Sequence, residues 1–106
     1  MKINFIRAFE DNYIWTIEKG KDVILIDPGE AYPCFKYLKD KKLYAILLTH
    51  KHMDHVGGVK KLKEKYEDFL VYGPSETKNL NDKTLKDEDE FEIFGYKFKV
   101  LKTNGH

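Results

Sequence analysis

The sequence predicts a layered α/β (α+β) domain, and two observations carry this prediction. Short apolar runs rich in β-branched and aromatic residues are typical of strands, and they alternate with two segments of helical periodicity. Because strands and helices are mixed along only 106 residues, we expect one small domain with a sheet covered by helices. Hydrophobic residues make up 42% of the chain and aromatic residues 14%, a composition that argues against intrinsic disorder.

The first predicted strands lead to a sharp turn. Residues 2–9 alternate apolar and polar side chains, residues 11–12 (Asp-Asn) favour a turn, and residues 13–17 are aromatic and β-branched, so a hairpin is expected. Residues 23–26 form a continuous apolar run, which predicts a short buried strand. An Asp-Pro-Gly turn at residues 27–29 ends this strand.

The middle of the chain alternates helix and strand. Residues 33–39 begin with a proline, which is favoured in the first turn of a helix, and they predict a short helix. Residues 43–48 are apolar throughout and predict a second buried strand. Residues 56–66 carry apolar side chains three and four positions apart, which predicts an amphipathic helix.

The last third of the chain is predicted to be mostly extended. Residues 69–72 predict another short strand, closed by Gly-Pro. Residues 75–89 are polar and irregular, and we expect a loop with one helical turn. Residues 91–94 and 96–101 predict a hairpin that turns at Gly95.

Charge and cysteine content exclude several classes of protein. The chain has 19 Lys and Arg against 18 Asp and Glu, a net charge of +1, so it lacks the basic character of a nucleic-acid-binding domain. No apolar run reaches the roughly 18 residues of a membrane-spanning helix. Cys34 is the only cysteine, which points to a reducing compartment, and early acidic residues argue against a secretory signal. We therefore expect a cytoplasmic domain that binds neither nucleic acid nor membrane.

The residues that can carry chemistry are concentrated at positions 49–55, Thr-His-Lys-His-Met-Asp-His. Three of the four histidines, His50, His52 and His55, lie here with Asp54, directly after a predicted strand. Neutral imidazoles and carboxylates are ligands of transition metals, so this density predicts a metal site. Because the chain has a single cysteine, a catalytic site is favoured over a structural zinc site closed by thiolates.

The spacing of these ligands divides them into two pairs. His50 and His52 are two residues apart, so on extended backbone their side chains point the same way. Asp54 and His55 follow where the chain turns toward the predicted helix, and they can face a second, nearby position. Two adjacent metal ions favour hydrolysis, because together they activate water and stabilise negative charge on a substrate oxygen.

Residues 49–55 resemble the T-H-x-H-x-D-H signature of the metallo-β-lactamase superfamily. Two further segments are similar to the same superfamily. Residues 24–29 (ILIDPG) resemble its strand followed by a turn, and residues 103–106 (TNGH) resemble its T-P-G-H segment. Asn104 stands where proline is usual, which leaves the imidazole of His106 in place but loosens the approach to it.

One branch of the superfamily is the more specific match. Residues 9–15 (FEDNYIW) resemble the A-F-x-D-N-Y-I-W opening of the hydroxyacylglutathione hydrolases, also called glyoxalase II. Residues 54–59 and 71–74 are also similar to bacterial members of that family. The resemblance extends over the whole chain, and it is the source of the expected substrate class.

The resemblance implies a ligand set and a reaction. His50, His52 and His106 would bind one divalent metal ion, and Asp54 and His55 would contribute to a second. Zinc is the first choice of metal, with iron or manganese as alternatives. Asp54, the expected catalytic residue, would orient the hydroxide that attacks the thioester of S-lactoylglutathione. The products would be glutathione and D-lactate, as in methylglyoxal detoxification.

The resemblance also implies that residues 1–106 are the N-terminal half of an αββα sandwich. Family members are about twice as long, and their bridging aspartate, last histidine ligand and most glutathione-binding residues lie further along. The second metal site would therefore be incomplete. Phe5, Tyr13, Trp15 and Phe91 would form an exposed apolar patch that favours self-association.

Two alternatives to an active thioesterase stay open. The chain could be a truncated remnant that binds metal without catalysis. It could also be another hydrolase of the same fold or a related enzyme: a lactonase, a β-lactamase or a mononuclear iron persulfide dioxygenase. Residues 9–15 argue against this second group, through resemblance alone.

Overall fold

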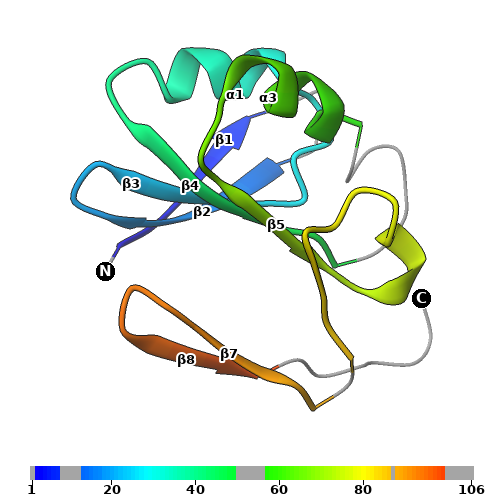
Figure 1. Cartoon of the computed structure of the whole chain (residues 1–106). Helices are drawn as coiled ribbons and strands as arrows, with labels where there is room; N and C mark the ends of the chain where they lie inside the picture. The colour runs from blue at the N-terminus through cyan, green and yellow to red at the C-terminus, as the bar shows by residue number, and fades with distance from the viewer. Residues whose placement is uncertain (1, 8–12, 50–56, 87, 100–106) are drawn as a thin grey trace.

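A computed structural model describes residues 2–7, 13–49, 57–86 and 88–99 of the chain. Its main feature is a six-stranded mixed sheet in the order β1-β2-β3-β4-β5-β6. Two helices cover one face of this sheet, and a separate two-stranded hairpin lies against the other (Figure 1). The predicted α/β (α+β) class is therefore confirmed. Within these ranges, no helix is long and apolar enough to cross a membrane.

The sheet begins antiparallel and continues parallel. β1 (Lys2–Arg7), β2 (Tyr13–Lys19) and β3 (Asp22–Ile26) are antiparallel neighbours. β4 (Lys42–Leu47) and β5 (Leu70–Gly73) then run parallel to β3. Each of these strands lies within a few residues of its predicted position. The carboxyl ends of β3, β4 and β5 therefore meet at one edge of the sheet, which is where ligand sites of parallel sheets form.

The parallel strands are joined by the two helices. α1 (Tyr32–Tyr37) connects β3 to β4, and α3 (Val59–Lys65) connects β4 to β5. Both pack on one face of the sheet around buried apolar side chains. The most deeply buried members of this cluster are Val23, Leu25, Cys34, Ile46, Val59, Leu62 and Val71.

Two short elements lie in the polar stretch after β5, and only the second differs from expectation. The predicted helical turn is present as a 3₁₀ turn, η1 (Ser75–Thr77). β6 (Lys83–Thr84) was not predicted, because two exposed polar residues carry no strand pattern. The side chain of Asn81 holds this segment by donating hydrogen bonds to the carbonyl oxygens of Gly73 (3.0 Å) and Pro74 (2.8 Å).

The hairpin of β7 (Glu90–Ile93) and β8 (Tyr96–Lys99) forms the third layer. It turns at Gly95, as predicted, where a φ of 81° suits glycine. Its apolar side chains cover the face of the sheet opposite the helices. The cluster there contains Ile17, Ile24 and Ala45 below Ile93, with Phe91, Phe94 and Phe98 around them.

The hairpin leaves one end of that face open. Phe5, Tyr13 and Trp15 are 45%, 45% and 48% exposed, and Ile3 beside them is 67% exposed. The apolar patch predicted from the sequence is therefore present at these three aromatic residues. Phe91 differs, because it is half-buried and stacks between Tyr72 and Phe98. We call Ile3, Phe5, Tyr13 and Trp15 the aromatic strip.

Candidate metal centre and adjoining pocket

All five predicted metal ligands lie outside the described residues. His50, His52, Asp54 and His55 fall in residues 50–56, and His106 falls in residues 100–106. Among the residues that are described, no three His, Cys, Asp or Glu side chains are grouped to hold a metal ion. The ligand set and the catalytic role of Asp54 therefore stay predictions, and the structure bears on the residues that flank them.

Thr49 directly precedes residues 50–55, which we call the histidine segment, and it is fixed to the turn after β3. The Asp27 carboxylate accepts two hydrogen bonds from it, one from the Thr49 backbone N–H (2.7 Å) and one from the Thr49 hydroxyl (2.5 Å). The Asp27 backbone N–H also donates to the carbonyl oxygen of Leu47 (2.9 Å). Asp27 is thus hydrogen-bonded to Leu47, the last residue of β4, and to Thr49, two residues further along.

Asp27 adopts a backbone conformation that few residues other than glycine tolerate. Its φ is 51°, in the left-handed region, where Asp and Asn are enriched among non-glycine residues. Such a conformation costs of order 1 kcal/mol or more and persists where neighbouring interactions hold it. The hydrogen bonds to Leu47 and Thr49 are those interactions. They hold Asp27 in this conformation, and they also orient Thr49.

Gly58, three residues after His55, is fixed to the same turn. Its backbone N–H donates to the carbonyl oxygen of Pro28 (2.9 Å). A Cβ atom at Gly58 would lie 2.6 Å from the carbonyl carbon of Glu30 and 2.7 Å from the nitrogen of Ala31. These are backbone atoms, so no larger residue fits at Gly58 without moving the chain.

The turn at residues 27–31 therefore binds the chain on both sides of the histidine segment. Asp27 holds Thr49, and Pro28 to Ala31 receive Gly58. The residues that flank the segment with four of the five predicted ligands thus contact one turn, beside the carboxyl ends of parallel strands. Anchored flanks of this kind are the support that a metal site needs around its ligands.

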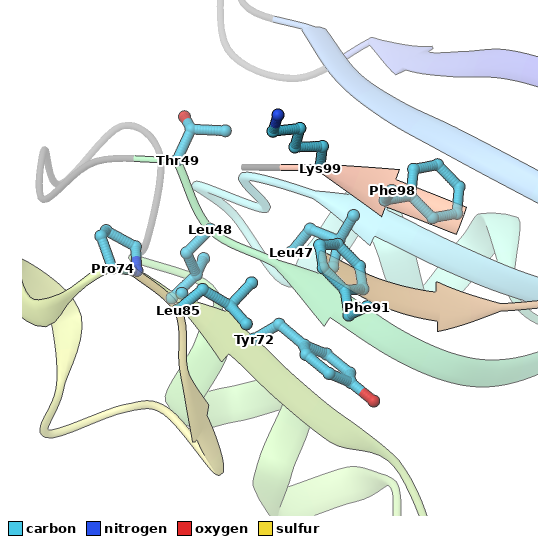
Figure 2. Close-up of a pocket in the computed structure, with 10 residues that line it drawn as sticks. Leu47, Leu48, Thr49, Tyr72, Pro74, Leu85, Phe91, Phe98 and Lys99 are labelled. Carbon is cyan, nitrogen blue, oxygen red and sulfur yellow. The ribbon is translucent and has the colours of Figure 1, made fainter. Parts of the chain in front are cut away.

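A pocket of about 250 Å³ opens next to Thr49, between the sheet and the hairpin. Apolar side chains of β4, β5 and the hairpin line most of it (Figure 2). Thr49 and Lys99 supply its polar groups, and Figure 2 shows the Thr49 hydroxyl and the Lys99 ammonium pointing to the same side. The apolar lining comprises Leu47, Leu48, Tyr72, Pro74, Leu85, Phe91 and Phe98.

Of the two polar lining residues, Thr49 is next to the predicted ligand His50 in sequence, and Lys99 is seven residues before the predicted ligand His106. Thr49 directly precedes residues 50–56, and Lys99 directly precedes residues 100–106. Both segments that carry predicted ligands therefore leave from the rim of one pocket. The pocket thus brings together Thr49 and Lys99, which are 50 residues apart in the chain.

The single thiol of the chain is not part of this site. Cys34 is fully buried in the helix-side core, where its Sγ donates to the carbonyl oxygen of Glu30 (3.3 Å). Burial, and then the charge of Glu30, raises the pKa of this thiol to about 12. A thiol held neutral is a poor nucleophile and a poor ligand, so Cys34 is a packing residue.

The supporting roles of Asp27, Gly58 and Thr49 are not apparent from the sequence around each residue. An Asp-Pro-Gly sequence is typical of the end of a strand. The residues around it do not indicate that the Asp27 carboxylate binds Thr49, 22 positions away. The paired glycines gave a partial signal, because two consecutive glycines next to a predicted metal segment indicate a close backbone approach.

Comparison with known proteins identifies relatives along the whole chain. Residues 8–106 match the profile of the metallo-β-lactamase superfamily. The hydroxyacylglutathione hydrolase of Cronobacter sakazakii is 46% identical over 111 residues, which cover 100% of this chain and 44% of that protein. The protein of the same name from Actinobacillus pleuropneumoniae serotype 5b is 39% identical, over an alignment that covers 100% of this chain and 46% of that protein. The chain thus spans less than half the length of these relatives.

A solved structure supports the fold independently. The crystal structure of ETHE1 from Myxococcus xanthus superposes with a TM-score of 0.75 at 20% sequence identity. The match covers 93% of this chain and 47% of the ETHE1 chain. At this identity the likeness concerns the fold, and it agrees with the mixed sheet, the helix layer and the hairpin described above.

Proposed function

The chain belongs to the metallo-β-lactamase superfamily, and on this basis we propose that it carries the metal-binding part of a glyoxalase II-type thioester hydrolase. Its substrate class would be S-(2-hydroxyacyl)glutathione, with S-lactoylglutathione as the reference compound and glutathione and D-lactate as products. The observation that carries the proposal is the 46% identity, over the full length of the chain, to a protein named hydroxyacylglutathione hydrolase. We also propose a cytoplasmic location for it.

The donor set suits a divalent transition metal. Three imidazoles and a carboxylate within six residues, with a further imidazole at His106, match the nitrogen and oxygen ligands that zinc, iron and manganese accept. His50, His52 and His106 would hold the first ion, and Asp54 and His55 would contribute to a second, incomplete site. When bound, such ions lower the pKa of water and polarise a thioester carbonyl.

The protein's own residues supply position and charge. Asp54 would accept a hydrogen bond from the attacking water and so orient it toward the thioester carbon. Asp27 and Gly58 support the histidine segment at its two ends, which keeps the ligands from being displaced during reaction. The departing thiolate is stable in water, so no strong general acid is required.

The test is thioester hydrolysis by the purified chain after loading with zinc, iron or manganese. We expect metal-dependent loss of S-lactoylglutathione that a chelator abolishes and that His52→Ala removes. Lys51→Ala is the matched control, since it changes the neighbouring residue and leaves every predicted ligand in place. No rate above the chelated chain in any metal form would contradict the proposal for this polypeptide.

Metal content separates the hydrolase from the remnant interpretation. A chain that binds one metal ion tightly and has no turnover would fit a metal-binding remnant. Two tightly bound ions per chain, measured by elemental analysis after gel filtration, would contradict the incomplete second site.

A further inference from the structure

The turn of the β7–β8 hairpin contains a residue that the turn geometry disfavours. Ile93 and Tyr96 are the last paired residues of the two strands, so Phe94 and Gly95 form a two-residue loop. Both have a positive φ, 60° at Phe94 and 81° at Gly95, as a type I′ turn requires. Such turns favour Asn-Gly, and a bulky side chain with positive φ is an outlier. An outlier of this kind persists where the surrounding structure holds it, so the contacts of Phe94 are informative.

The ring of Phe94 packs on Tyr44 of β4. The two ring centroids are 4.9 Å apart and the ring planes are inclined by 43°, which is within the range of favourable aromatic pairs. Phe94 also packs against the buried cluster around Ile93 on the hairpin side of the sheet. Neither ring belongs to the aromatic strip, whose residues lie on β1 and β2. The contact therefore joins the turn of the hairpin to the main sheet.

Tyr44 reaches this position because its own strand is irregular. Val23 pairs with Leu43 and Ile24 pairs with Ala45, so Tyr44 is the extra residue of a bulge. In a regular strand, consecutive side chains face opposite sides of the sheet. Here Tyr44 contacts the hairpin and Ala45 also belongs to the hairpin-side cluster. Bulges are rare between parallel strands and redirect side chains, and this one directs Tyr44 toward Phe94.

We propose that Tyr44 and Phe94 form an aromatic clamp, which fixes the turn of the hairpin on the sheet and thereby positions the chain that leads to the predicted ligand His106. Two locally unfavourable features, the turn and the bulge, meet in this one contact, and the contact accounts for both. A two-stranded hairpin is marginally stable by itself, so it needs such a support.

The link to His106 rests on the proposed metal site. At the end of the hairpin remote from its turn, Lys99 lines the pocket together with Thr49. The chain continues from Lys99 to His106, and Thr49 is followed by His50. A metal ligand has to be held within roughly 0.5 Å of its productive position, so the placement of the hairpin affects the site. Tyr44 and Phe94 are positioning residues, because they act through the hairpin.

The central experiment is amide hydrogen exchange of the metal-free chain carrying Phe94→Asn. Asparagine suits the first position of a type I′ turn, so this variant relieves the backbone while it removes the ring. If the clamp holds the hairpin, amide protection in β7 and β8 should fall roughly two- to tenfold, the range for loss of one aromatic pair. If Phe94 were only a poor turn residue, protection would rise instead.

Variants of the partner ring show whether the two rings act together. Tyr44→Ala should lower hairpin protection by a similar factor, whereas Tyr44→Phe keeps the ring and should retain protection. In the Phe94→Asn background, Tyr44→Ala should have little further effect, because each ring acts through the other. Tyr32→Ala is the matched control and should leave the hairpin unchanged. Tyr32 is 74% exposed and lies on α1, over the opposite face of the sheet (Figure 1).

Zinc provides a readout that a purely structural contact would not change. If His106 shares an ion with His50 and His52, the hairpin carries one ligand of an ion that the main sheet also holds. Zinc should then raise hairpin protection, and His106→Ala should remove this gain. Release of zinc to a chelator should be roughly two- to tenfold faster in Phe94→Asn than in the unmodified chain, by the same factor as the loss of protection.

The outcomes separate the clamp from the proposed function. Hairpin protection that is unchanged or raised in Phe94→Asn, or lowered equally in Tyr32→Ala, would overturn the clamp. Zinc binding that alters neither hairpin protection nor its own release rate in Phe94→Asn would overturn the positioning role. A chain that binds no zinc would contradict the proposed metal site and the positioning role with it, while the metal-free measurements would still decide whether the clamp holds the hairpin.

Discussion

Glu18 is a carboxylate of β2 that is buried against α1. It is 4% exposed and accepts hydrogen bonds from the Thr16 hydroxyl (2.8 Å) and from the Tyr37 hydroxyl. Lys41 lies 3.7 Å from its other oxygen. A buried carboxylate is tolerated only when its oxygens are satisfied in this way. The group therefore fixes the end of α1 to β2.

Tyr37→Phe should be destabilising because it removes a donor from this buried carboxylate. We expect a loss of about 1–3 kcal/mol in the free energy of unfolding, measured by urea denaturation. Tyr32→Phe removes an exposed hydroxyl from the same helix and should change it by less than about 0.5 kcal/mol. Equal effects of the two variants would show that the Glu18 contact contributes nothing.

Glu18 should also make stability depend on pH. Burial by itself would raise the pKa of Glu18, but the hydrogen bonds from Tyr37 and Thr16 and the charge of Lys41 outweigh it and lower the pKa. A carboxyl with a lowered pKa in the folded state contributes stability above its unfolded pKa, and this is lost as the pH falls through the folded value. Glu18→Gln should therefore reduce the fall in unfolding free energy between roughly pH 5 and pH 3. An unchanged pH profile would contradict this.

At the scale of elements, the turn at residues 27–31 joins β3, α1 and the chain before α3. Its position was predictable, because Asp-Pro-Gly after an apolar run ends a strand. Its role was not predictable, because that role depends on contacts with Thr49 and Gly58 that are distant in sequence. The second helix also starts later than predicted. Its expected start is residue 56, but α3 begins at Val59, directly after Gly58, which packs against the turn.

Gly58→Ala tests this contact. The added methyl group meets backbone atoms at 2.6–2.7 Å, so we expect a loss of about 1–3 kcal/mol in unfolding free energy and weaker metal binding. Gly20→Asn is the comparison, since Gly20 has open space around it and a φ of 61° that asparagine tolerates. If Gly58→Ala were as mild as Gly20→Asn, the turn would be more adaptable than the structure indicates.

A second feature that could not be predicted is which side chains of β4 face the helices and which face the hairpin. Val23 pairs with Leu43 but Ile24 pairs with Ala45, so β4 has one extra residue, Tyr44, opposite β3. The bulge turns Ala45 toward the hairpin side, whereas Leu43 faces the helices. In the run LYAILL every residue is apolar, so the sequence contains no alternation that would show the change of phase.

Among the described residues, the hairpin contacts the main sheet through packed apolar side chains, and it needs this support because a two-stranded sheet is marginally stable by itself. Ile93 is its buried anchor at 3% exposed. Ile93→Ala should lower amide-exchange protection in β7 and β8 roughly tenfold to a thousandfold and leave β3 and β4 little changed. Glu92→Ala, at the exposed neighbouring position, should have no such effect. Equal loss of protection in the main sheet would show that hairpin and sheet open as one unit.

At the scale of the whole molecule, the layered fold was largely predictable because most strands and both helices carry clear periodicity. The helix predicted over residues 33–39 is α1, and the strands predicted over residues 23–26 and 43–48 are the buried β3 and β4. The expectation of ligands at His50, His52, Asp54 and His55 rests on residue type and spacing, whereas that of His106 rests on the resemblance to the T-P-G-H segment. Their geometry falls in segments outside the described residues, so the metal centre stays a prediction supported by its flanks.

Metal binding should stabilise the whole molecule if the site requires the folded chain. At free zinc about 100 times the dissociation constant, we expect about 2.7 kcal/mol of added stability, seen as a higher midpoint of thermal unfolding. A chelator should reverse it. His52→Ala should abolish the gain and Lys51→Ala should retain it; a gain that survives His52→Ala would place the metal elsewhere.

The order of strands in the sheet bears on how the chain is made. Each strand from β1 to β6 lies beside the strand that precedes it in sequence. A chain emerging from the ribosome can therefore add each strand to an edge that already exists, without waiting for a later segment to fill a gap. The hairpin is synthesised after the sheet against which it packs, so the surface that receives it is complete before it arrives. This strand order permits assembly in the direction in which the chain is translated.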